Sequence, residues 1–442
     1  MKRILSITLL LLLLFGSVTG CQNKAKLSPK DPVTLTIWHN YGGEMQNTMD
    51  LLIDEFNATI GKEKGIIVTV TAISSSSDLD NSLAMIANGD PGAPQPPDIS
   101  TGYPKIAIQL QEKDMLLNLD DYFTEEELSA YVDAFLSEGR FSDGGLYVFP
   151  LAKSTEVLFL NQTLFDEFSA ETGASADLLA SFEGIARLSQ MYYDWSDGKQ
   201  FFTADSWFNV AEVGMMQLGA DLFDENNSLA LDTDSYQHIF ETLYTPSAEG
   251  GFAIHDGYSS DLSKTGDILC STGSSAGILF YGNTITYPDA SSKEVEYSIL
   301  PYPVFEGGEK WALQRGGGLI AFKTDERKAL AAAEFLKWLT APKQNMAFIS
   351  QTGYLPVTKQ AFESDLQTHL DGLEDVQIKK LLTSVLSMYE DYQFFAAPNF
   401  SDFDAVSDKY EEDFKAQMLH GQRAVQDNAP VSAQEALEEL KK

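Results

Sequence analysis

One short stretch of the sequence matches a catalytic motif. Residues 273–277 read Gly-Ser-Ser-Ala-Gly, the G-x-S-x-G pattern of a nucleophile elbow, which needs a strand before the serine and a helix after it. The next residues, Ile278 to Tyr281, form a β-like run, so we expect no activated serine here. The 65 Asp and Glu residues supply many accidental carboxylate pairs, and a glycoside hydrolase therefore stays an alternative. Because an acid excess is more simply a solvated surface, we expect a protein that is not an enzyme.

The sequence lacks the spacing of known metal sites. Its five His residues show neither H-E-x-x-H nor H-x₃-H spacing, and its two cysteines form no cluster. Asp402, Asp404 and Asp408 lack the glycine and the terminal Glu of a calcium loop. We therefore expect neither a metal ion nor a cofactor.

Three consecutive glycines, Gly316 to Gly318, follow Arg315. Glycine permits positive φ and close backbone approach, which suits a crossing between two parts of a chain. A glycine-rich turn can also cradle phosphate, and Arg315 with Lys153 could pair with it. The P-loop pattern G-x-x-x-x-G-K-[ST] is absent, however, so phosphate binding is only an alternative.

Length and charge exclude several classes of protein. The chain has 442 residues, more than the ~150 of a typical domain, which predicts two or three units with a core. With 44% hydrophobic and 21% charged residues, its balance is that of a globular protein. Its net charge of −35 disfavours DNA, RNA and anionic lipid surfaces, because binding phosphate backbones needs clustered Lys and Arg.

The N-terminus has the features of an export signal. Lys2 and Arg3 precede an apolar run, residues 4–15, that is too short to span a bilayer, which needs ~20 residues. The following Val-Thr-Gly-Cys sequence resembles the lipobox of bacterial lipoproteins, whose cysteine is diacylated before cleavage. We therefore predict a signal peptide over 1–20, lipidation of Cys21 and a polar tether over 21–32. An ordinary cleaved signal with an incidental cysteine is the alternative.

Strands and helices alternate after the tether. The sequence predicts strands over 33–38 and 66–72 and at 98–100, and amphipathic helices from Glu44 to Phe56 and over 79–87. This βαβαβ order predicts an α/β fold with a mostly parallel sheet. Ligands of such sheets sit at the carboxyl ends of the strands, where the turns 39–43 and 100–103 fall.

A second unit begins after Gly144-Gly145. Strands over 146–150 and 156–160 flank the polar stretch 152–155. One helical face is predicted to carry Leu178, Phe182, Ile185, Leu188 and Tyr192. Later segments predict a strand over 317–322, a helix over 325–339 with Thr324 as N-cap and Pro342 as its end, and a final charged helix over 432–442.

Six segments of the chain, in this order, resemble one family of proteins. They are TLTIWHNYGGEM, the Pro-Pro-Asp-Ile strand entry, LYVFPLAKSTEVLFLNQTLF, SAGILFYGN, GGGLIAFKTDERKALAAAEFLKWLT and TGYLPVT. The resemblance covers essentially everything after Cys21. It is to the extracellular solute-binding proteins of bacterial ABC importers, family 1, in the cluster that includes maltose- and glycerol-3-phosphate-binding lipoproteins and periplasmic proteins.

The resemblance implies a two-lobed α/β fold of the periplasmic-binding-protein type, each lobe a mostly parallel sheet flanked by helices. The N-terminal lobe would comprise 33–151 plus 315–352 and the C-terminal lobe 153–313 plus 353–442, with crossings near 151–155, 313–316 and 353–355. Contacts from both lobes exist only in the closed form, so a ligand shifts the population toward closure. The family further implies a monomer on the outer face of the cell membrane, or in the periplasm, that delivers a carbohydrate to its permease and touches the membrane only through its lipid.

The resemblance also implies where the solute binds. Sugars present apolar ring faces and hydroxyls, so their sites combine aromatic platforms with carboxylates, amides and backbone donors. Candidates in polar turns and at the crossings are His39, Tyr41, Glu44, Tyr103, Lys153, Ser154, Thr155, Glu156, Trp207, Tyr281, Asn283, Arg315, Gly317 and Tyr354, whereas Trp38 is assigned to the core. Glycerol-3-phosphate or a related phospho-polyol is the alternative ligand. Members of that branch usually carry a further basic residue near the crossing into the C-terminal lobe, and residues 396–406 hold none.

Overall fold

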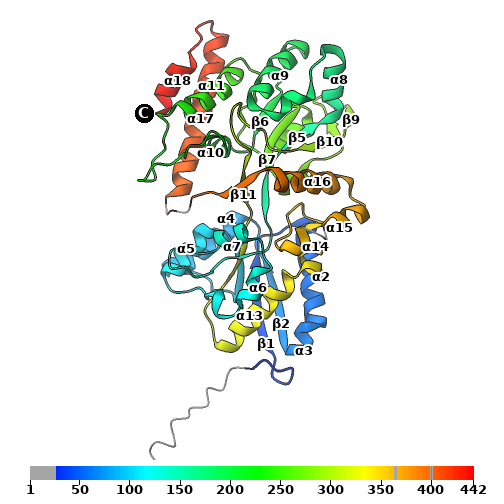
Figure 1. The fold of residues 1–442 in the computed structure, drawn as a ribbon, viewed down its shortest axis with the longest axis vertical. Helices are drawn as coiled ribbons and strands as arrows, with labels where there is room; N and C mark the ends of the chain where they lie inside the picture. The colour runs from blue at the N-terminus through cyan, green and yellow to red at the C-terminus, as the bar shows by residue number, and fades with distance from the viewer. Residues whose placement is uncertain (1–25, 363–365, 399, 401) are drawn as a thin grey trace, which may run out of the picture.

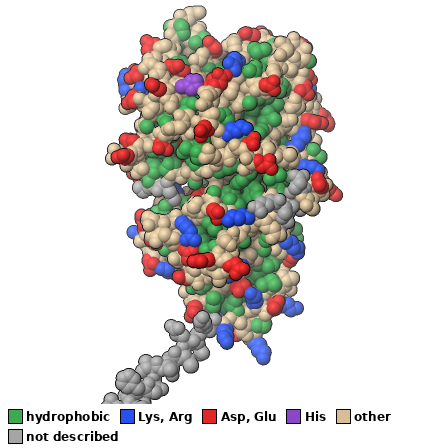
Figure 2. Space-filling view, in the orientation of Figure 1, with side chains coloured by type: hydrophobic (Ala, Val, Ile, Leu, Met, Phe, Trp, Pro, Cys, Tyr) green, Lys and Arg blue, Asp and Glu red, His purple; other side chains and the backbone are tan. Residues whose placement is uncertain are grey.

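The computed structural model describes residues 26–442 except 363–365, 399 and 401. Two lobes, each with its own sheet and helices, lie one above the other along the long axis (Figure 1). Cys21, the predicted signal peptide and the first residues of the tether lie outside the described residues. Within the described part, no helix is long and apolar enough to cross a membrane. Acidic and basic side chains are mixed over the face seen in Figure 2, and no basic patch forms there.

The first lobe contains a five-stranded sheet in the order β2-β1-β3-β12-β4. In β1 every second residue is buried, as expected of a strand whose side chains alternate between faces. The strands are β1 (Val33–His39), β2 (Ile66–Ala72), β3 (Ile99–Gly102), β4 (Phe149–Pro150) and β12 (Gly318–Ala321).

Helices cover both faces of this first sheet. Helix α2 buries Met49, Leu52, Ile53 and Phe56 on one stripe, which packs with α13 and α14 over one face, while α4 and α5 cover the other. The elements are α2 (Gly43–Ala58), α3 (Ile60–Lys64), α4 (Ser76–Asn88), α5 (Pro104–Glu112), η1 (Leu119–Asp121), α6 (Glu125–Ser129), α7 (Asp133–Glu138), α13 (Glu326–Leu339) and α14 (Pro342–Ile349).

The second lobe contains a six-stranded sheet in the order β13-β11-β5-β7-β6, with β10 also paired to β5. All residues of β5 are buried, which suits its apolar centre Val157 to Leu160, whereas its polar ends, Ser154 to Glu156 and Asn161, are held by hydrogen bonds. The strands are β5 (Ser154–Asn161), β6 (Phe202–Ala204), β7 (Cys270–Ser274), β10 (Tyr297–Leu300), β11 (Trp311–Arg315) and β13 (Gln393–Ala396), and a separate hairpin joins β8 (Thr284–Thr286) to β9 (Ser292–Glu294).

The helices of the second lobe surround one large hydrophobic core. They are α8 (Gln162–Thr172), η2 (Ala176–Ala180), α9 (Phe182–Trp195), α10 (Trp207–Gln217), α11 (Asp234–Ala248), α12 (Ser259–Thr265), η3 (Ser275–Phe280), α15 (Leu366–Gly372), α16 (Val376–Asp391), α17 (Phe403–Gln426) and α18 (Ala433–Leu440).

Two neighbouring segments carry the chain between the lobes. Residues 151–153 join β4 to β5, and residues 316–317 join β11 back to β12. The segments touch, because Gly316 has a φ of +98° and a Cβ there would collide with the carbonyl oxygen of Ala152. Here the conformational freedom of glycine is required.

The third crossing is predicted near 353–355. The backbone N–H of Leu355 donates to the Lys153 carbonyl at 2.7 Å. The chain still bonds the first lobe four residues later, where Lys359 N–H donates to the Ala130 carbonyl at 2.9 Å. These contacts favour a crossing after Lys359, and the domain limits stay a prediction.

The two-lobed α/β architecture is confirmed, but its sheets are mixed rather than mostly parallel. Only the β1 pairs with β2 and β3 are parallel in the first sheet, and only β11–β13 and β6–β7 are parallel in the second. The remaining pairings are antiparallel. The prediction was wrong because strand direction depends on where the chain re-enters a lobe, which local sequence does not reveal.

Several local predictions also need correction. Residues 278–280 lie in the 3₁₀ helix η3 instead of a strand, because the pairing of β7 with β5 ends at Ser274, and Tyr281 follows the helix. Leu178 lies in η2, apart from the face of α9. Asp325, not Thr324, caps α13, since its carboxylate accepts the N–H groups of the first turn. Of the strand predicted over 146–150, only β4 forms. Trp38 is partly buried against the α4–α5 side.

Candidate functional site

A large cavity lies between the two lobes. Its volume of about 600 Å³ falls within the roughly 300–1,000 Å³ of small-molecule sites. The first lobe contributes residues of α4, α5 and α7, and the second contributes α10, α17 and the segment after β13, with β11 at the base. Both lobes therefore surround any solute held there.

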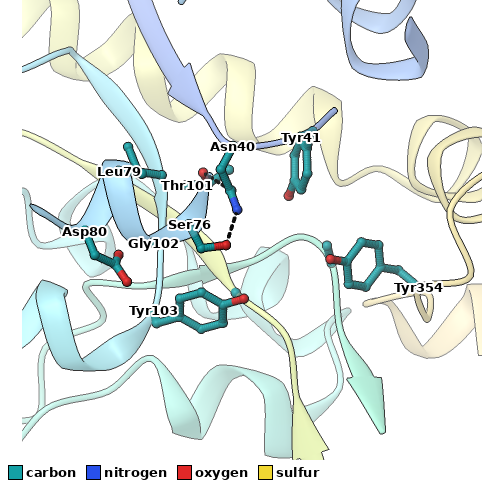
Figure 3. A pocket seen from close by; sticks show the side chains of 11 residues that line it. Asn40, Tyr41, Ser76, Leu79, Asp80, Thr101, Gly102, Tyr103 and Tyr354 are labelled. Carbon is teal, nitrogen blue, oxygen red and sulfur yellow. Dashed lines mark hydrogen bonds between the residues drawn. The ribbon is translucent and has the colours of Figure 1, made fainter. Parts of the chain in front are cut away.

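Three tyrosines from separate segments meet beside this cavity. Tyr41 follows β1, Tyr103 follows β3 and Tyr354 follows α14, and their hydroxyl groups point toward a common space (Figure 3). Burial raises the pKa of all three phenols, and Tyr103 further raises the pKa of Tyr41 and of Tyr354. They are therefore neutral and offer hydroxyls that both donate and accept. The space is a crevice of about 20 Å³, and Tyr103 connects it to the larger cavity.

Asp80 is a site residue that sequence reasoning missed. It lies on α4, lines both the crevice and the cavity, and sits near Tyr103 (Figure 3). Burial raises the pKa of its carboxyl, while the charge of Lys105 acts in the opposite direction. Asp80 lies within a helix and not in a turn at the end of a strand, so its place in the sequence did not predict it as a site residue.

Tyr258 was also missed. It caps α12 in the second lobe, its side chain is 73% exposed, and it is close enough to raise the pKa of Tyr103. Tyr103 itself is 43% exposed. Tyr103 lines the cavity and Tyr258 of the second lobe lies near it, and accessible rings of this kind can pack against the apolar face of a sugar.

Arg315 is held at the base of the cavity by a buried carboxylate. One Glu156 oxygen accepts from Arg315 Nη1 at 2.5 Å and from Asn209 Nδ2 at 3.0 Å. The Glu156 side chain is only 4% exposed, whereas that of Arg315 is 39% exposed. Arg315 therefore faces the cavity and Glu156 lies behind it.

Cations at the cavity are already neutralised by carboxylates. Each of the four Lys and Arg side chains that line it or stand at its base forms an ion pair. The pairs are Lys105–Asp404, Arg140–Asp120 at 2.8 Å, Lys153–Glu138 at 2.7 Å and Arg315–Glu156 at 2.5 Å. An anionic solute would have to displace one of these carboxylates, so the electrostatics favour an uncharged one.

The structure brings several predicted site residues together. Tyr41, Tyr103, Gly317 and Tyr354 line the crevice, and Arg315 lines the cavity. Lys153, Ser154, Thr155 and Glu156 stand at the crossing beside them, but all four are buried. Thr155 Oγ1 donates to the Leu313 carbonyl at 2.9 Å, and Ser154 Oγ accepts from Ser274 at 3.2 Å. These groups hold the crossing segments together and are not exposed to a solute.

Other candidates lie away from the cavity. His39 is fully buried behind Tyr41, whose N–H donates to its Nδ1 at 3.3 Å, and burial lowers the pKa of its imidazole. Trp207 is fully buried with its ring stacked near Phe252 and Phe414. Neither side chain lines the cavity or the crevice, because both are fully buried in the lobes.

Three further candidates, Tyr281, Glu44 and Asn283, also lie away from the cavity. Tyr281 is buried on Phe159, with ring centroids 4.1 Å apart, and its hydroxyl bonds to Ser259 and Ser271. Glu44 is exposed in the first turn of α2, and Asn283 is exposed beside the β8–β9 hairpin. Neither lines the cavity or the crevice.

The G-x-S-x-G serine has no catalytic setting. Ser275 is fully buried, and its Oγ accepts the backbone N–H of Thr155 at 3.4 Å. It acts in the hinge region as a structural group. Among the residues that the structure describes, no group of three or more His, Cys, Asp or Glu side chains is arranged to hold a metal ion.

Comparison with known proteins gives consistent results. Residues 52–372 match the family described as bacterial extracellular solute-binding protein. An sn-glycerol-3-phosphate-binding periplasmic protein of Shigella dysenteriae is 23% identical over 351 residues, 75% of each chain. Its Escherichia coli K12 counterpart is 22% identical over the same share.

Solved structures share the fold at low sequence identity. The cyclic alpha-maltosyl-1,6-maltose binding protein of Arthrobacter globiformis gives a TM-score of 0.72 at 20% identity, over 92% of this chain and 97% of that one. A Mycobacterium tuberculosis protein solved with glycerophosphocholine gives 0.71 at 16% identity, over 92% and 96%. These likenesses show the two-lobed fold.

Proposed function

The chain belongs to the family of bacterial extracellular solute-binding proteins, and from that premise we propose that it captures a carbohydrate between its lobes and delivers it to the permease of an ABC importer. Members of this family bind solutes and are not enzymes. Similar proteins are named for binding a cyclic maltosyl-maltose and sn-glycerol-3-phosphate. The choice between an uncharged and a phosphorylated solute depends on whether the Lys and Arg side chains at the cavity are free to bind a phosphate.

The observation that carries the carbohydrate proposal is the pairing of the cavity cations. Arg315 and Lys153, the two candidates for phosphate contact, each bind a carboxylate, which is buried in Glu156 and partly buried in Glu138. The groups left free for a solute are the neutral tyrosine hydroxyls, the Asp80 carboxyl and exposed aromatic rings. Such a set suits hydroxyls and apolar ring faces.

Glycerol-3-phosphate or a related phospho-polyol is the second candidate, because the curated relatives carry that name. For such a ligand, Arg315 would have to exchange Glu156 for the phosphate. Titration calorimetry separates the candidates with mono- to trisaccharides in one arm and sn-glycerol-3-phosphate in the other. Saccharide binding without phosphate binding supports the proposal, and the reverse contradicts it.

Lobe closure is the mechanism that this function requires. A solute that contacts both lobes stabilises the closed arrangement relative to the open one. Small-angle scattering should therefore show a smaller radius of gyration at saturation with a bound saccharide. An unchanged radius at saturation would count against closure.

Attachment to the membrane is a separate part of the proposal. The lipobox-like sequence supports a lipid on Cys21 and a tether that holds a monomeric body outside the cell membrane, or in the periplasm. Labelling with a fatty-acid analogue tests this directly. Label on the wild type but not on Cys21→Ala supports the anchor.

A further inference from the structure

A second, smaller cavity adjoins the cavity between the lobes. Its volume is about 290 Å³, roughly half that of the main cavity. Helix α10, the loop after it, the end of β13 and the segment that follows form its walls, with Glu212, Met216, Phe223, Phe395, Ala396 and Pro398 among the lining residues. Ala396 and Pro398 also line the main cavity, so the two meet there.

Glu212 contributes an unusual group to this side cavity. It is 4% exposed, and within the part of the chain that the structure describes both of its carboxyl oxygens are buried without a hydrogen-bond partner. Burying such a group without a partner destabilises the fold. The remaining buried neighbours on α10 are mostly apolar, so an apolar residue would suit packing better here. A costly polar group that packing does not require is typical of a binding residue.

The chemistry of the side cavity favours an uncharged, hydroxylated occupant. Burial raises the pKa of Glu212 to about 8, although the charge of Arg315 opposes this. At neutral pH the carboxyl is therefore mostly protonated and offers one O–H donor together with acceptor oxygens. Phe223 and Phe395 supply aromatic wall against which an apolar ring face can pack.

Resting on the carbohydrate function proposed above, we propose that this side cavity is a second subsite, in which Glu212 hydrogen-bonds an additional ring of the solute. The solute is then an oligosaccharide that passes Ala396 and Pro398 and occupies both cavities. The side cavity is just below the roughly 300 Å³ at which small-molecule sites begin, so it suits one unit and not a whole chain.

Titration calorimetry with glucose, maltose and maltotriose, and with the matching β-linked and xylose-based series, tests this subsite. Two variants change the residue itself: Glu212→Met keeps the length of the side chain, and Glu212→Gln keeps its hydrogen bonding. Glu225→Gln, at an exposed acid of the same lobe, is the charge-matched control. We expect the wild type to bind a di- or trisaccharide at least about tenfold more tightly than the monosaccharide, as one extra hydrogen-bonded unit would give. Glu212→Met should lose that preference for length, whereas Glu212→Gln and Glu225→Gln should keep it within about threefold.

The outcomes separate this inference from the function on which it rests. Binding without any preference for length, or a preference that survives in Glu212→Met, overturns the subsite and leaves carbohydrate capture intact. If no saccharide binds the wild type, the carbohydrate function fails, and the subsite fails with it. Melting temperature without sugar supplies an independent check, because Glu212→Met should melt at or above the wild type. A marked fall would show that Glu212 is a structural group.

Discussion

Replacing Glu156 with glutamine tests how Arg315 is positioned. The buried Glu156 carboxylate accepts from both Arg315 and Asn209, while the Arg315 side chain remains accessible from the cavity. Glutamine keeps the shape and one acceptor oxygen but removes the charge. Glu156 thus acts on a solute through Arg315 and not by direct contact, which changes the role predicted for it from the sequence.

The magnitude follows from the geometry of this pair. Hydrogen bonds to charged groups contribute about 1.5–3 kcal/mol and neutral ones about 0.5–1.5 kcal/mol, so removing the charge should cost about 1–2 kcal/mol. The roughly 3–5 kcal/mol of a broken, fully buried pair is an upper limit, which is not reached because water can solvate Arg315 from the cavity. For a unit the size of one lobe, this corresponds to a fall in melting temperature of roughly 2–8 °C.

The assay combines scanning calorimetry with titration of inorganic phosphate and sn-glycerol-3-phosphate. Glu156→Gln should melt lower and bind both anions more tightly than the wild type, because its Arg315 has no competing carboxylate. Glu306→Gln is the matched control, since its 2.8 Å pair with Arg187 is more than half exposed on both sides and should contribute less than about 1 kcal/mol. Equal melting temperatures and equal phosphate affinities in Glu156→Gln and the wild type would refute the reasoning.

Four other outcomes are expected. Relative to Glu212→Gln, the wild type should lose free energy of unfolding as pH rises from about 4.5 to about 8, by at most about 1.4 kcal/mol per pH unit. In this range the folded state holds a proton on Glu212 that the unfolded state has released. Urea midpoints measured across the range show whether stability falls as expected. Tyr103→Ala should weaken saccharide binding by about 1 kcal/mol and Tyr103→Phe by less, since the ring is kept; equal losses by calorimetry would argue against stacking. Lys105→Ala removes the pair with Asp404 across the cavity, so scattering without ligand should show a larger radius of gyration than the wild type gives. Cys21→Ala should lose fatty-acid label yet bind solute with unchanged affinity, and label that persists would rule out this cysteine as the anchor.

Part of the site could be predicted from the sequence because it lies in local features. Tyr41 and Tyr103 follow apolar strands in polar turns, and strand ends of one sheet share an edge, so both reach the crevice. Trp207 and Tyr281 also stand near polar residues, but rings from distant segments bury them. Asp80 lines the cavity but was not predicted, since its position on a helix gives no sign that the helix borders the cavity.

In the fold, too, features encoded within one segment could be predicted, whereas features that depend on contacts between distant segments could not. Apolar periodicity located the helices α2, α4, α9, α13 and α18 and several of the buried strands, because burial of one face is encoded within each segment, but it did not identify helices such as α10, α11 and α17. The pairing of β12 between β3 and β4 is not encoded in that way. It depends on the chain leaving the first lobe, building most of the second and returning, which requires contacts far apart in sequence.

The position of β12 sets an order for folding during synthesis. Gly318 pairs with Gly102, so the edge of β3 remains open until most of the second lobe has left the ribosome. Contacts of such long sequence separation form slowly, and an open strand edge favours aggregation in the meantime. A chain built in this way can complete its first lobe only after roughly seven-tenths of its residues have been synthesised, so the first lobe cannot fold fully as an early, independent N-terminal unit.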